Sequence, residues 1–373
     1  MSENPLIPVE ISFSPKEKHQ SSSRIFQGIP GIEVSKSGRI WATWYSGGSA
    51  EGPENYVFIV SSSDNGSSWS DPVAVIDPPG NVRAYDPVLW HDQQGRLWWF
   101  WSQSLSPADG KIHDGRAGVW CAFTEDSDSK KPLFSKPIHI ANGVMMNKPT
   151  FLSNGEWALP TAVWEYYEPK LDEFKNERFS NIVISEDSGK SFYLRGRADV
   201  PSRAFDEHMI IELKDKRLWM LVRTCYGVGQ SFSSDMGKTW TPGEDSGLGG
   251  PNSRFFIRRL SSGKLLLINH VNPETGEKMN KRSHLSAFLS DDDGKRWKGG
   301  LLLDEREKVS YPDGVEDKNG VIRVIYDRNR FAHRDGEADI LMASFREEDV
   351  LSGKCVTSDA RLKILINRIN SAK

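Results

Sequence analysis

The stretch Ser233–Trp240 reads SSDMGKTW and fits the pattern S-x-D-x-G-x-x-[WF]. In such a segment the aspartate carboxylate caps a tight turn, and the glycine takes a backbone angle that other residues resist. The aromatic ring then covers the hairpin. The pattern recurs at three other places, Ser62–Trp69, Ser185–Phe192 and Ser290–Trp297. A turn signature that returns at long intervals indicates an array of similar units.

The spacing of these boxes predicts the size of the unit. Their aspartates lie at positions 64, 187, 235 and 292, so the first interval is about twice each of the others. We therefore expect a degenerate copy in between, and Thr124–Asp128 (TEDSD) fits that place. A unit of roughly 50 to 60 residues holds four short strands, which is the size of one propeller blade.

A second motif, related to G-x-[LI]-W, predicts how many units there are. It marks hairpin starts at Gly38–Trp41, Gly95–Trp98, Gly155–Trp157, Lys216–Trp219, Gly263–Leu266 and Gly320–Ile322. Six starts predict an all-β fold, a six-bladed β-propeller with box turns, as a single domain over residues 1–373. We expect the last strands, near 340–345, to close against the N-terminal segment and so remove free sheet edges. Residues 347–351 and the C-terminal tail are expected to form short turns.

Composition excludes several classes of function. The chain of 373 residues has a net charge of −3 and no basic stripe, so nucleic acid is not an expected partner. Its three cysteines lack metal-binding spacing and indicate free thiols in a reducing compartment. Neither a signal peptide nor a run of about 18 apolar residues is visible. We expect a cytoplasmic monomer with no membrane partner, metal or cofactor.

With its boxes and six predicted blades, the chain resembles the sialidase superfamily, six-bladed propellers that cleave terminal acidic sugars. The boxes themselves are structural, so two other segments carry the functional part of the resemblance. One runs from Glu207 (EHMIIEL) to Arg223, 16 residues later, and the other from Tyr311 (YPDG) to Tyr326-Asp327. The resemblance implies that Tyr311 is a nucleophile, Glu207 its base, and Arg223 a ligand of the substrate carboxylate. The family ends the second segment with Tyr-Glu, where this chain has Tyr-Asp.

The chemistry explains why a tyrosine suits this role. A substrate with a carboxylate on its anomeric carbon would repel a carboxylate nucleophile, whereas a neutral phenol avoids that repulsion. A base within hydrogen-bond reach must then take the phenol proton.

The resemblance implies further site residues and one departure. Arg282 would grip the substrate carboxylate with two parallel hydrogen bonds. Glu51, on the loop ahead of the first box, stands at the position of the acid/base, with Glu54 as a weaker substitute. The family opens its first blade with an arginine before Ile-Pro, but this chain has Gly28 there, in FQGIP. We therefore expect an acidic sugar other than common N-acetylneuraminic acid, such as a related ulosonic acid or a uronate.

Polar residues also stand at the starts of the other predicted inner strands. We expect Asp86, Lys148 and Arg254 to lie with Glu207 and Tyr311 around one central mouth, because inner strands of a propeller begin there. Lys148 or Arg254 is expected to supply the charge that Gly28 lacks. His208, beside Glu207, is interpreted as a packing histidine rather than a second proton shuttle.

Three functions remain open from the sequence. The first is a sialidase-like exo-glycoside hydrolase acting on a terminal acidic sugar. The second is a lyase for uronate-bearing glycans, in which the same residues would act as base and carboxylate ligands. The third is a non-catalytic carbohydrate-binding propeller, which would need no nucleophile pair.

Overall fold

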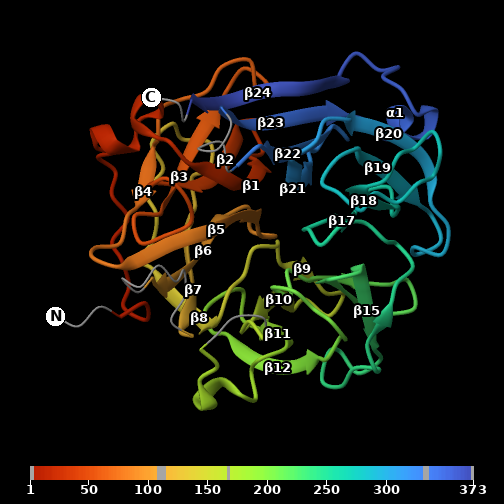
Figure 1. The fold of residues 1–373 in the computed structure, drawn as a ribbon, viewed down its shortest axis with the longest axis horizontal. Helices are drawn as coiled ribbons and strands as arrows, with labels where there is room; N and C mark the ends of the chain where they lie inside the picture. The colour runs from red at the N-terminus through yellow and green to blue at the C-terminus, as the bar shows by residue number, and fades with distance from the viewer. Residues whose placement is uncertain (1–3, 107–114, 166–168, 331–335, 371–373) are drawn as a thin grey trace. The chain divides into compact units, whose positions relative to one another are not determined.

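The computed structural model describes residues 4–106, 115–165, 169–330 and 336–370, and nearly all regular structure in them is β-sheet (Figure 1). Six sheets follow one another along the chain, and each has four strands in sequence order. Within the described residues the one α-helix is α1 (Glu347–Ser352), in the segment expected to form a short turn. Three short 3-10 helices complete the list: η1 (Glu17–His19), η2 (Ser21–Ser23) and η3 (Asp172–Phe174).

The chain divides into two compact units. Unit 1 comprises Met1–His139, Tyr311–Ala343 and Lys363–Lys373. Unit 2 comprises Ile140–Ser310 and Ser344–Leu362. The single domain over residues 1–373 stays a prediction.

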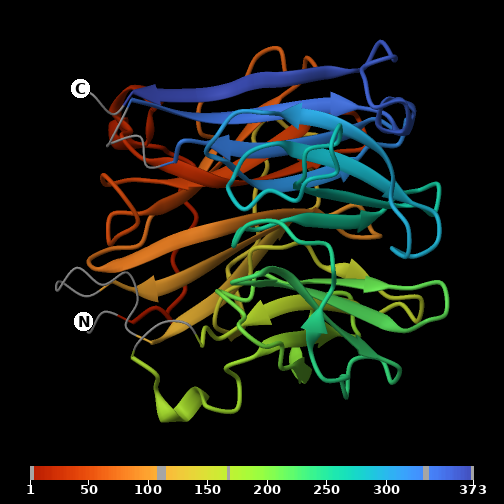
Figure 2. The ribbon, with the colours of Figure 1, turned by 45° about the vertical axis from the view of Figure 1, so that its right-hand side comes forward.

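Three sheets belong largely to unit 1. The first contains β1 (Gln27–Val34), β2 (Ile40–Ser46), β3 (Tyr56–Ser62) and β4 (Ala74–Ile76). The second contains β5 (Val82–His91), β6 (Leu97–Leu105), β7 (Ala117–Thr124) and β8 (Ile138–Asn142). The third contains β21 (Val309–Glu316), β22 (Ile322–Arg328), β23 (Glu337–Phe345) and β24 (Arg361–Asn370), of which β23 and β24 run side by side in Figure 2.

The other three sheets belong to unit 2. One contains β9 (Thr150–Phe151), β10 (Trp157–Ala162), β11 (Ser180–Ser185) and β12 (Tyr193–Ala198). The next contains β13 (Met209–Glu212), β14 (Leu218–Thr224), β15 (Gly227–Ser233) and β16 (Glu244–Asp245). The last contains β17 (Phe256–Arg259), β18 (Leu265–His270), β19 (Leu285–Ser290) and β20 (Lys298–Asp304). Six sheets of four strands confirm the number of blades predicted from the hairpin starts.

Apolar side chains from neighbouring sheets form the core of each unit. In unit 1, Trp44 and Phe58 of the first sheet pack in one cluster with Ile325 and Met342 of the last. In unit 2, a cluster built in the same way joins β10 and β11 to β13 and β14. Burial between sheet faces is the main stabilising term, because it removes the largest apolar area from water.

The box turns form the connection between the third and fourth strands of their sheets. In the box after β15, the Asp235 carboxylate accepts hydrogen bonds from Thr239 N (2.9 Å), Thr239 Oγ1 (2.6 Å) and Ser233 Oγ (2.8 Å). Ser233 Oγ in turn accepts a hydrogen bond from Gly237 N at 2.8 Å, and Trp240 Nε1 donates one to Gly237 O at 3.0 Å. Gly237 has a φ of 89°, and a Cβ there would lie 2.8 Å from an isoleucine side chain. Every fixed position of the motif therefore has a physical role.

The degenerate copy after β7 keeps part of this network. Thr124 ends the strand, and its Oγ1 accepts Asp126 N at 3.3 Å. Asp126 Oδ1 accepts Ser129 N at 3.1 Å. The turn also contacts the first sheet, because Trp41 Nε1 donates to Ser127 O at 2.8 Å. The predicted fifth turn is thus present at the expected place in its sheet.

Two expectations about the end of the chain need correction. The C-terminal tail is the strand β24, not a turn, and it completes the last sheet. The N-terminal segment adds no strand to that sheet in the described residues; it contacts the sheet through side chains, with Gln27 Nε2 donating to Ala338 O and Arg24 Nη2 to Asn367 Oδ1, both at 2.9 Å. Alternating apolar residues in RLKILINRIN were the signal for this strand.

We predict that Asp235→Ala lowers the melting temperature more than Asp126→Ala does. The first change removes a carboxylate with three hydrogen bonds, and the net contribution of one such bond to stability is about 1 kcal/mol. Hydrogen bonds from Thr239 lower the pKa of Asp235 from 3.8 to about 2, so its contribution is present above about pH 4 and is lost as the pH falls through 2. Thermal melts between pH 2 and 7 test this. Equal losses for both variants at neutral pH would contradict the structural role given to the box.

Candidate functional site

Three inner strands of unit 1 carry a left-handed residue directly before a proline. Ile29 (φ 54°), Asp86 (φ 50°) and Tyr311 (φ 55°) occupy this position in β1, β5 and β21. In β1 and β5 the pairing with the next strand is interrupted there by a bulge. A non-glycine residue in this conformation costs of order 1–3 kcal/mol, and a bulge redirects a side chain. Two of the three residues, Asp86 and Tyr311, are predicted site residues.

Tyr311 is almost completely buried, and a guanidinium covers its ring. Its exposed fraction is 4%, and Arg330 Cζ lies 4.5 Å from the ring centroid. Arg330 also forms long ion pairs with Asp327 Oδ2 (3.5 Å) and Glu51 Oε1 (3.6 Å). Burial acts to lower the pKa of Arg330, but electrostatic interactions with Tyr311, Asp327, Tyr45 and Glu51 raise it well above its ordinary value. The residue is therefore a buried, permanent cation.

Glu51 belongs to the same group. Tyr45 Oη donates a hydrogen bond to Glu51 Oε1 at 2.9 Å. The same carboxylate oxygen forms the ion pair with Arg330. Burial, and next the charge of Glu51, raise the pKa of Tyr45 well above its ordinary value, so Tyr45 stays a neutral donor. The predicted acid/base, Glu51, and the predicted nucleophile, Tyr311, thus both lie next to one guanidinium group, that of Arg330.

Asp86 lies at the edge of this group. It is 3% exposed, and its charge contributes to the raised pKa of Tyr45. Arg83, on the same strand, places its Cζ 4.2 Å from the Tyr85 ring centroid and 5.7 Å from that of Tyr45. We call Tyr311, Arg330, Glu51, Tyr45 and Asp86 the tyrosine cluster.

In unit 2, a second group forms around Glu207. Its Oε1 lies 2.5 Å from Arg223 Nη1, and both side chains are at least 95% buried. Arg223 Nε donates to Asn252 Oδ1 at 2.6 Å, and its guanidinium lies 4.7 Å from the Phe205 ring centroid. Glu207 has a φ of 39°, so its backbone is strained like that of Tyr311. Asn147 Nδ2 fixes this backbone by donating to Glu207 O at 2.8 Å.

Asn252 connects Arg223 with Arg282. Arg282 Nη2 donates to Asn252 O at 3.3 Å, and the Arg282 side chain is half-buried. Two predicted carboxylate ligands therefore lie on either side of one asparagine, which the sequence analysis did not select. We call Glu207, Arg223, Asn252 and Arg282 the glutamate cluster.

The neighbours of Glu207 have strongly shifted pKa values. Burial raises the pKa of Asp206 from 3.8 to about 6, although Arg203 Nε lies 3.0 Å from its Oδ1 and Ser180 donates to it. Burial lowers the pKa of His208 to about 4, and its Nε2 lies 2.7 Å from Asn181 O. His208 is thus neutral at pH 7 and fixed by the backbone, which agrees with its interpretation as a packing histidine.

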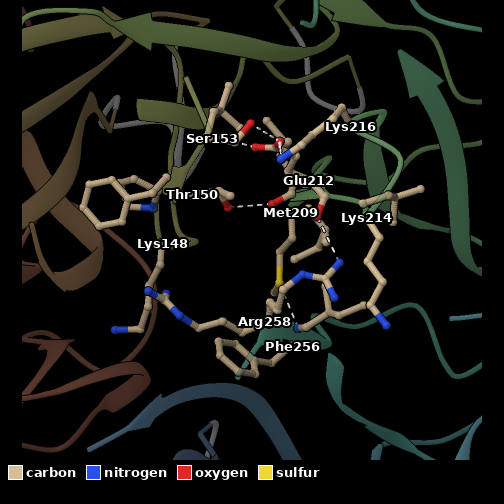
Figure 3. A pocket seen from close by; sticks show the side chains of 17 residues that line it. Lys148, Thr150, Ser153, Met209, Glu212, Lys214, Lys216, Phe256 and Arg258 are labelled. Atoms are coloured by element: carbon tan, nitrogen blue, oxygen red, sulfur yellow. Dashed lines mark hydrogen bonds and ion pairs between the residues drawn. The ribbon is translucent and has the colours of Figure 1, made fainter. Parts of the chain in front are cut away.

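Lys148 lines a pocket of about 530 Å³ within unit 2 (Figure 3). The walls come from the strands β9, β13 and β17 and include five cations, Lys148, Lys214, Lys216, Arg258 and Arg259. Among the residues that line the pocket, Glu212 is the one carboxylate. Its Oε1 lies 3.3 Å from Lys216 Nζ and accepts a hydrogen bond from Ser153 Oγ at 2.5 Å. The pocket is therefore positively charged. Arg254 does not line it and is 1% exposed.

The described residues include no group of three or more His, Cys, Asp or Glu side chains that could hold a metal ion. In that same part of the chain, no helix is long and apolar enough to cross a membrane. The two clusters themselves present phenol, carboxylate and guanidinium groups and the amide of Asn252.

We predict a specific pH dependence for Asp206. Its folded-state pKa is about 6 against an ordinary 3.8, so the folded protein binds the extra proton between these values. Stability from this group therefore decreases as the pH rises from about 4 to 6. Urea unfolding across that range should show that the free energy of unfolding depends less on pH in Asp206→Asn than in the wild type. Asp199→Asn, which removes an exposed partner of the same Arg203, serves as the control and should leave the slope unchanged. A wild-type slope in Asp206→Asn would contradict the assignment.

Comparisons with known proteins agree with this fold. Residues 38–324 match the model of the BNR repeat-like domain. A protein of unknown function from Dyadobacter fermentans is 17% identical, with a TM-score of 0.64 over 87% of this chain and 94% of its own. The NanB sialidase from Streptococcus pneumoniae is 13% identical, with a TM-score of 0.64 over 92% of this chain and 71% of its own. The intramolecular trans-sialidase from Ruminococcus gnavus is also 13% identical, with a TM-score of 0.65 over 89% of this chain and 96% of its own. No curated protein matches the sequence. The chain therefore belongs to the BNR repeat-like domain family and has the six-bladed β-propeller fold of the sialidase superfamily.

Proposed function

We propose that the protein is a sialidase-like exo-glycoside hydrolase that removes a terminal acidic sugar from a glycan. The observation that carries this proposal is the tyrosine cluster, in which Tyr311 and Glu51 share contact with one buried guanidinium. A phenol and a carboxylate held in this way suit a reaction at an anomeric carbon that bears a carboxylate. The sialidases among proteins of similar fold support the class of reaction and not its residues.

The first step forms a covalent intermediate. The Tyr311 oxygen attacks the anomeric carbon and the glycosidic bond breaks. Glu51 gives its proton to the departing oxygen, and Glu207 takes the phenol proton. The pairing of Tyr311 with Glu207 is proposed on the resemblance alone. The strained backbone at each residue supports a functional role for each, since such strain is concentrated at functional sites.

The second step releases the sugar. Glu51, now a carboxylate, takes a proton from water, and the water oxygen attacks the anomeric carbon. The bond to Tyr311 breaks, and the phenol regains its proton from Glu207. Tyr45 remains a neutral donor to Glu51 through both steps, because its pKa is raised far above neutrality.

The glutamate cluster supplies carboxylate binding in this proposal. Arg223 and Arg282, joined through Asn252, present two guanidinium groups, and such groups bind carboxylates in bidentate fashion. Lys148 and its basic pocket would favour further anionic groups of a longer glycan. Asp86 and Arg254 are proposed as substrate contacts on sequence grounds, as are the monomeric state and the cytoplasmic location.

A uronate lyase is the second candidate. The same phenol could act as a base on the carbon next to a carboxylate, with the arginines stabilising the negative charge. The two reactions differ in their products, because hydrolysis adds a water molecule and elimination leaves an unsaturated sugar.

We predict that Tyr311→Phe abolishes turnover, by a factor of at least about 1,000, while the protein stays folded. The phenyl ring keeps the packing under Arg330 but lacks the nucleophilic oxygen. Mass spectrometry of products from a panel of acidic oligosaccharides tests this, with Tyr56→Phe as the matched control. Tyr56 is an equally buried tyrosine whose hydroxyl donates to Lys18 O, away from the tyrosine cluster.

The products decide between the candidates. A hydrated acidic monosaccharide, lost in Tyr311→Phe and kept in Tyr56→Phe, supports the hydrolase. A product lighter by one water supports the lyase. Binding without turnover of any member of the panel would leave a carbohydrate-binding propeller and contradict the proposal.

A further inference from the structure

Gly28 forms a notch in β1 that the side chain of Arg330 fills. A Cβ at position 28 would lie 2.1 Å from Arg330 Cδ and 2.5 Å from Arg330 Cγ. Gly28 is not among the residues with positive φ, so the backbone itself does not require glycine there. The absence of a side chain at position 28 is therefore explained by the presence of Arg330, which arrives from the segment after β22.

The notch fixes where the guanidinium lies. Asp327 Oδ2 accepts Ile29 N at 2.9 Å and lies 3.5 Å from Arg330 Nη1, so one carboxylate holds both β1 and the arginine. The guanidinium then covers Tyr311 at 4.5 Å and approaches Glu51 at 3.6 Å. Arg330 is thus in contact with the proposed nucleophile and the proposed acid/base at once.

The two ion pairs of Arg330 are longer than close charge-assisted hydrogen bonds, which measure about 2.7–2.9 Å. Glu51 must also carry a proton at the moment when it acts as an acid. In that state Glu51 no longer offsets the charge of Arg330, and the attraction of the guanidinium for a substrate carboxylate is greater.

We infer that Arg330 binds the carboxylate of the substrate directly beside Tyr311, and that Gly28 exists to admit it. This inference rests on the proposed function, because it takes an acidic sugar as the substrate. It adds a specificity-determining residue that the sequence did not reveal. It also explains how a chain with glycine at position 28 can still offer a cation there.

The test measures how strongly the protein prefers a carboxylate over its neutral ester. The probes are 4-methylumbelliferyl glycosides of N-acetylneuraminic acid, 3-deoxy-D-manno-oct-2-ulosonic acid and glucuronic acid, each with its methyl ester. Dissociation constants are measured by fluorescence in the Tyr311→Phe background, which keeps the ring and prevents turnover. Circular dichroism and thermal melts confirm that each variant is folded.

We expect at least one acid to bind about tenfold or more tightly than its ester, the effect of a hydrogen bond to a charged group. Arg330→Gln should reduce this ratio to near one. Gly28→Ala should do the same, because its methyl group displaces Arg330. The matched control is Arg328→Gln on β22, which removes an arginine with a 3.5 Å ion pair to Asp339 and should keep the ratio.

A swap tests the position itself. Gly28→Arg combined with Arg330→Ala should recover part of the preference, because the new side chain starts from the vacated notch. Should Arg330→Gln not fold, Gly28→Ala and Arg330→Lys take its place. Arg330→Lys should give an intermediate acid-to-ester ratio, because lysine keeps the charge but lacks the planar guanidinium that binds a carboxylate with two hydrogen bonds.

Two results would overturn the inference. One is an unchanged acid-to-ester ratio in a folded Arg330→Gln or Gly28→Ala protein. The other is a Tyr311→Phe protein, with Gly28 and Arg330 intact, that binds none of the acids in preference to its ester. Failure of the proposed function is recognised separately, since turnover by Tyr311→Phe or an unsaturated product contradicts the mechanism without changing the binding ratio.

Discussion

Left-handed backbone within the inner strands is the constraint on which the candidate site depends. At Tyr311 and Asp86 it precedes a proline, which has no N–H for strand pairing and fixes its own φ. Regular alternation stops there, and the side chain leaves the direction that a flat strand would give it. Strain of this kind persists only where the surroundings hold it. The apolar clusters between neighbouring sheets supply that support in each unit.

The residues that hold the fold differ in their surroundings from those proposed to carry chemistry. The box aspartates are half-buried or exposed, and hydrogen bonds within their own turns satisfy them, so their effect is local. The charged residues of the two clusters are buried instead. Arg330, Arg223 and Glu207 are each less than 8% exposed, and buried charges are costly unless they are paired. Such burial of charged groups is the physical reason why these residues are proposed to serve binding or catalysis.

Much of the fold could be predicted from the sequence, because the boxes and hairpin starts are local patterns. Ser233, Asp235 and Gly237 contact one another within one turn, so their meaning can be read without a structure. Arg330 could not be found in this way. Its place beside Gly28 depends on contact between strands about 300 residues apart, although an unexpected glycine in the first motif indicated that a partner was needed. The glutamate cluster was easier to predict, since Glu207 lies just before β13 and Arg223 lies on the adjacent strand β14. Asn252 was missed because it belongs to the segment before the next sheet and meets Arg223 only in the folded chain.

The central claim is that Tyr311 is a covalent nucleophile. Its most direct test is trapping with a 2,3-difluoro derivative of whichever acidic sugar the protein turns over, because the fluorine atoms slow the release of the intermediate. Intact-mass spectrometry should show one adduct, and peptide mapping should place it on Tyr311. Turnover of the parent sugar with no adduct, or with an adduct on another residue, would contradict the account.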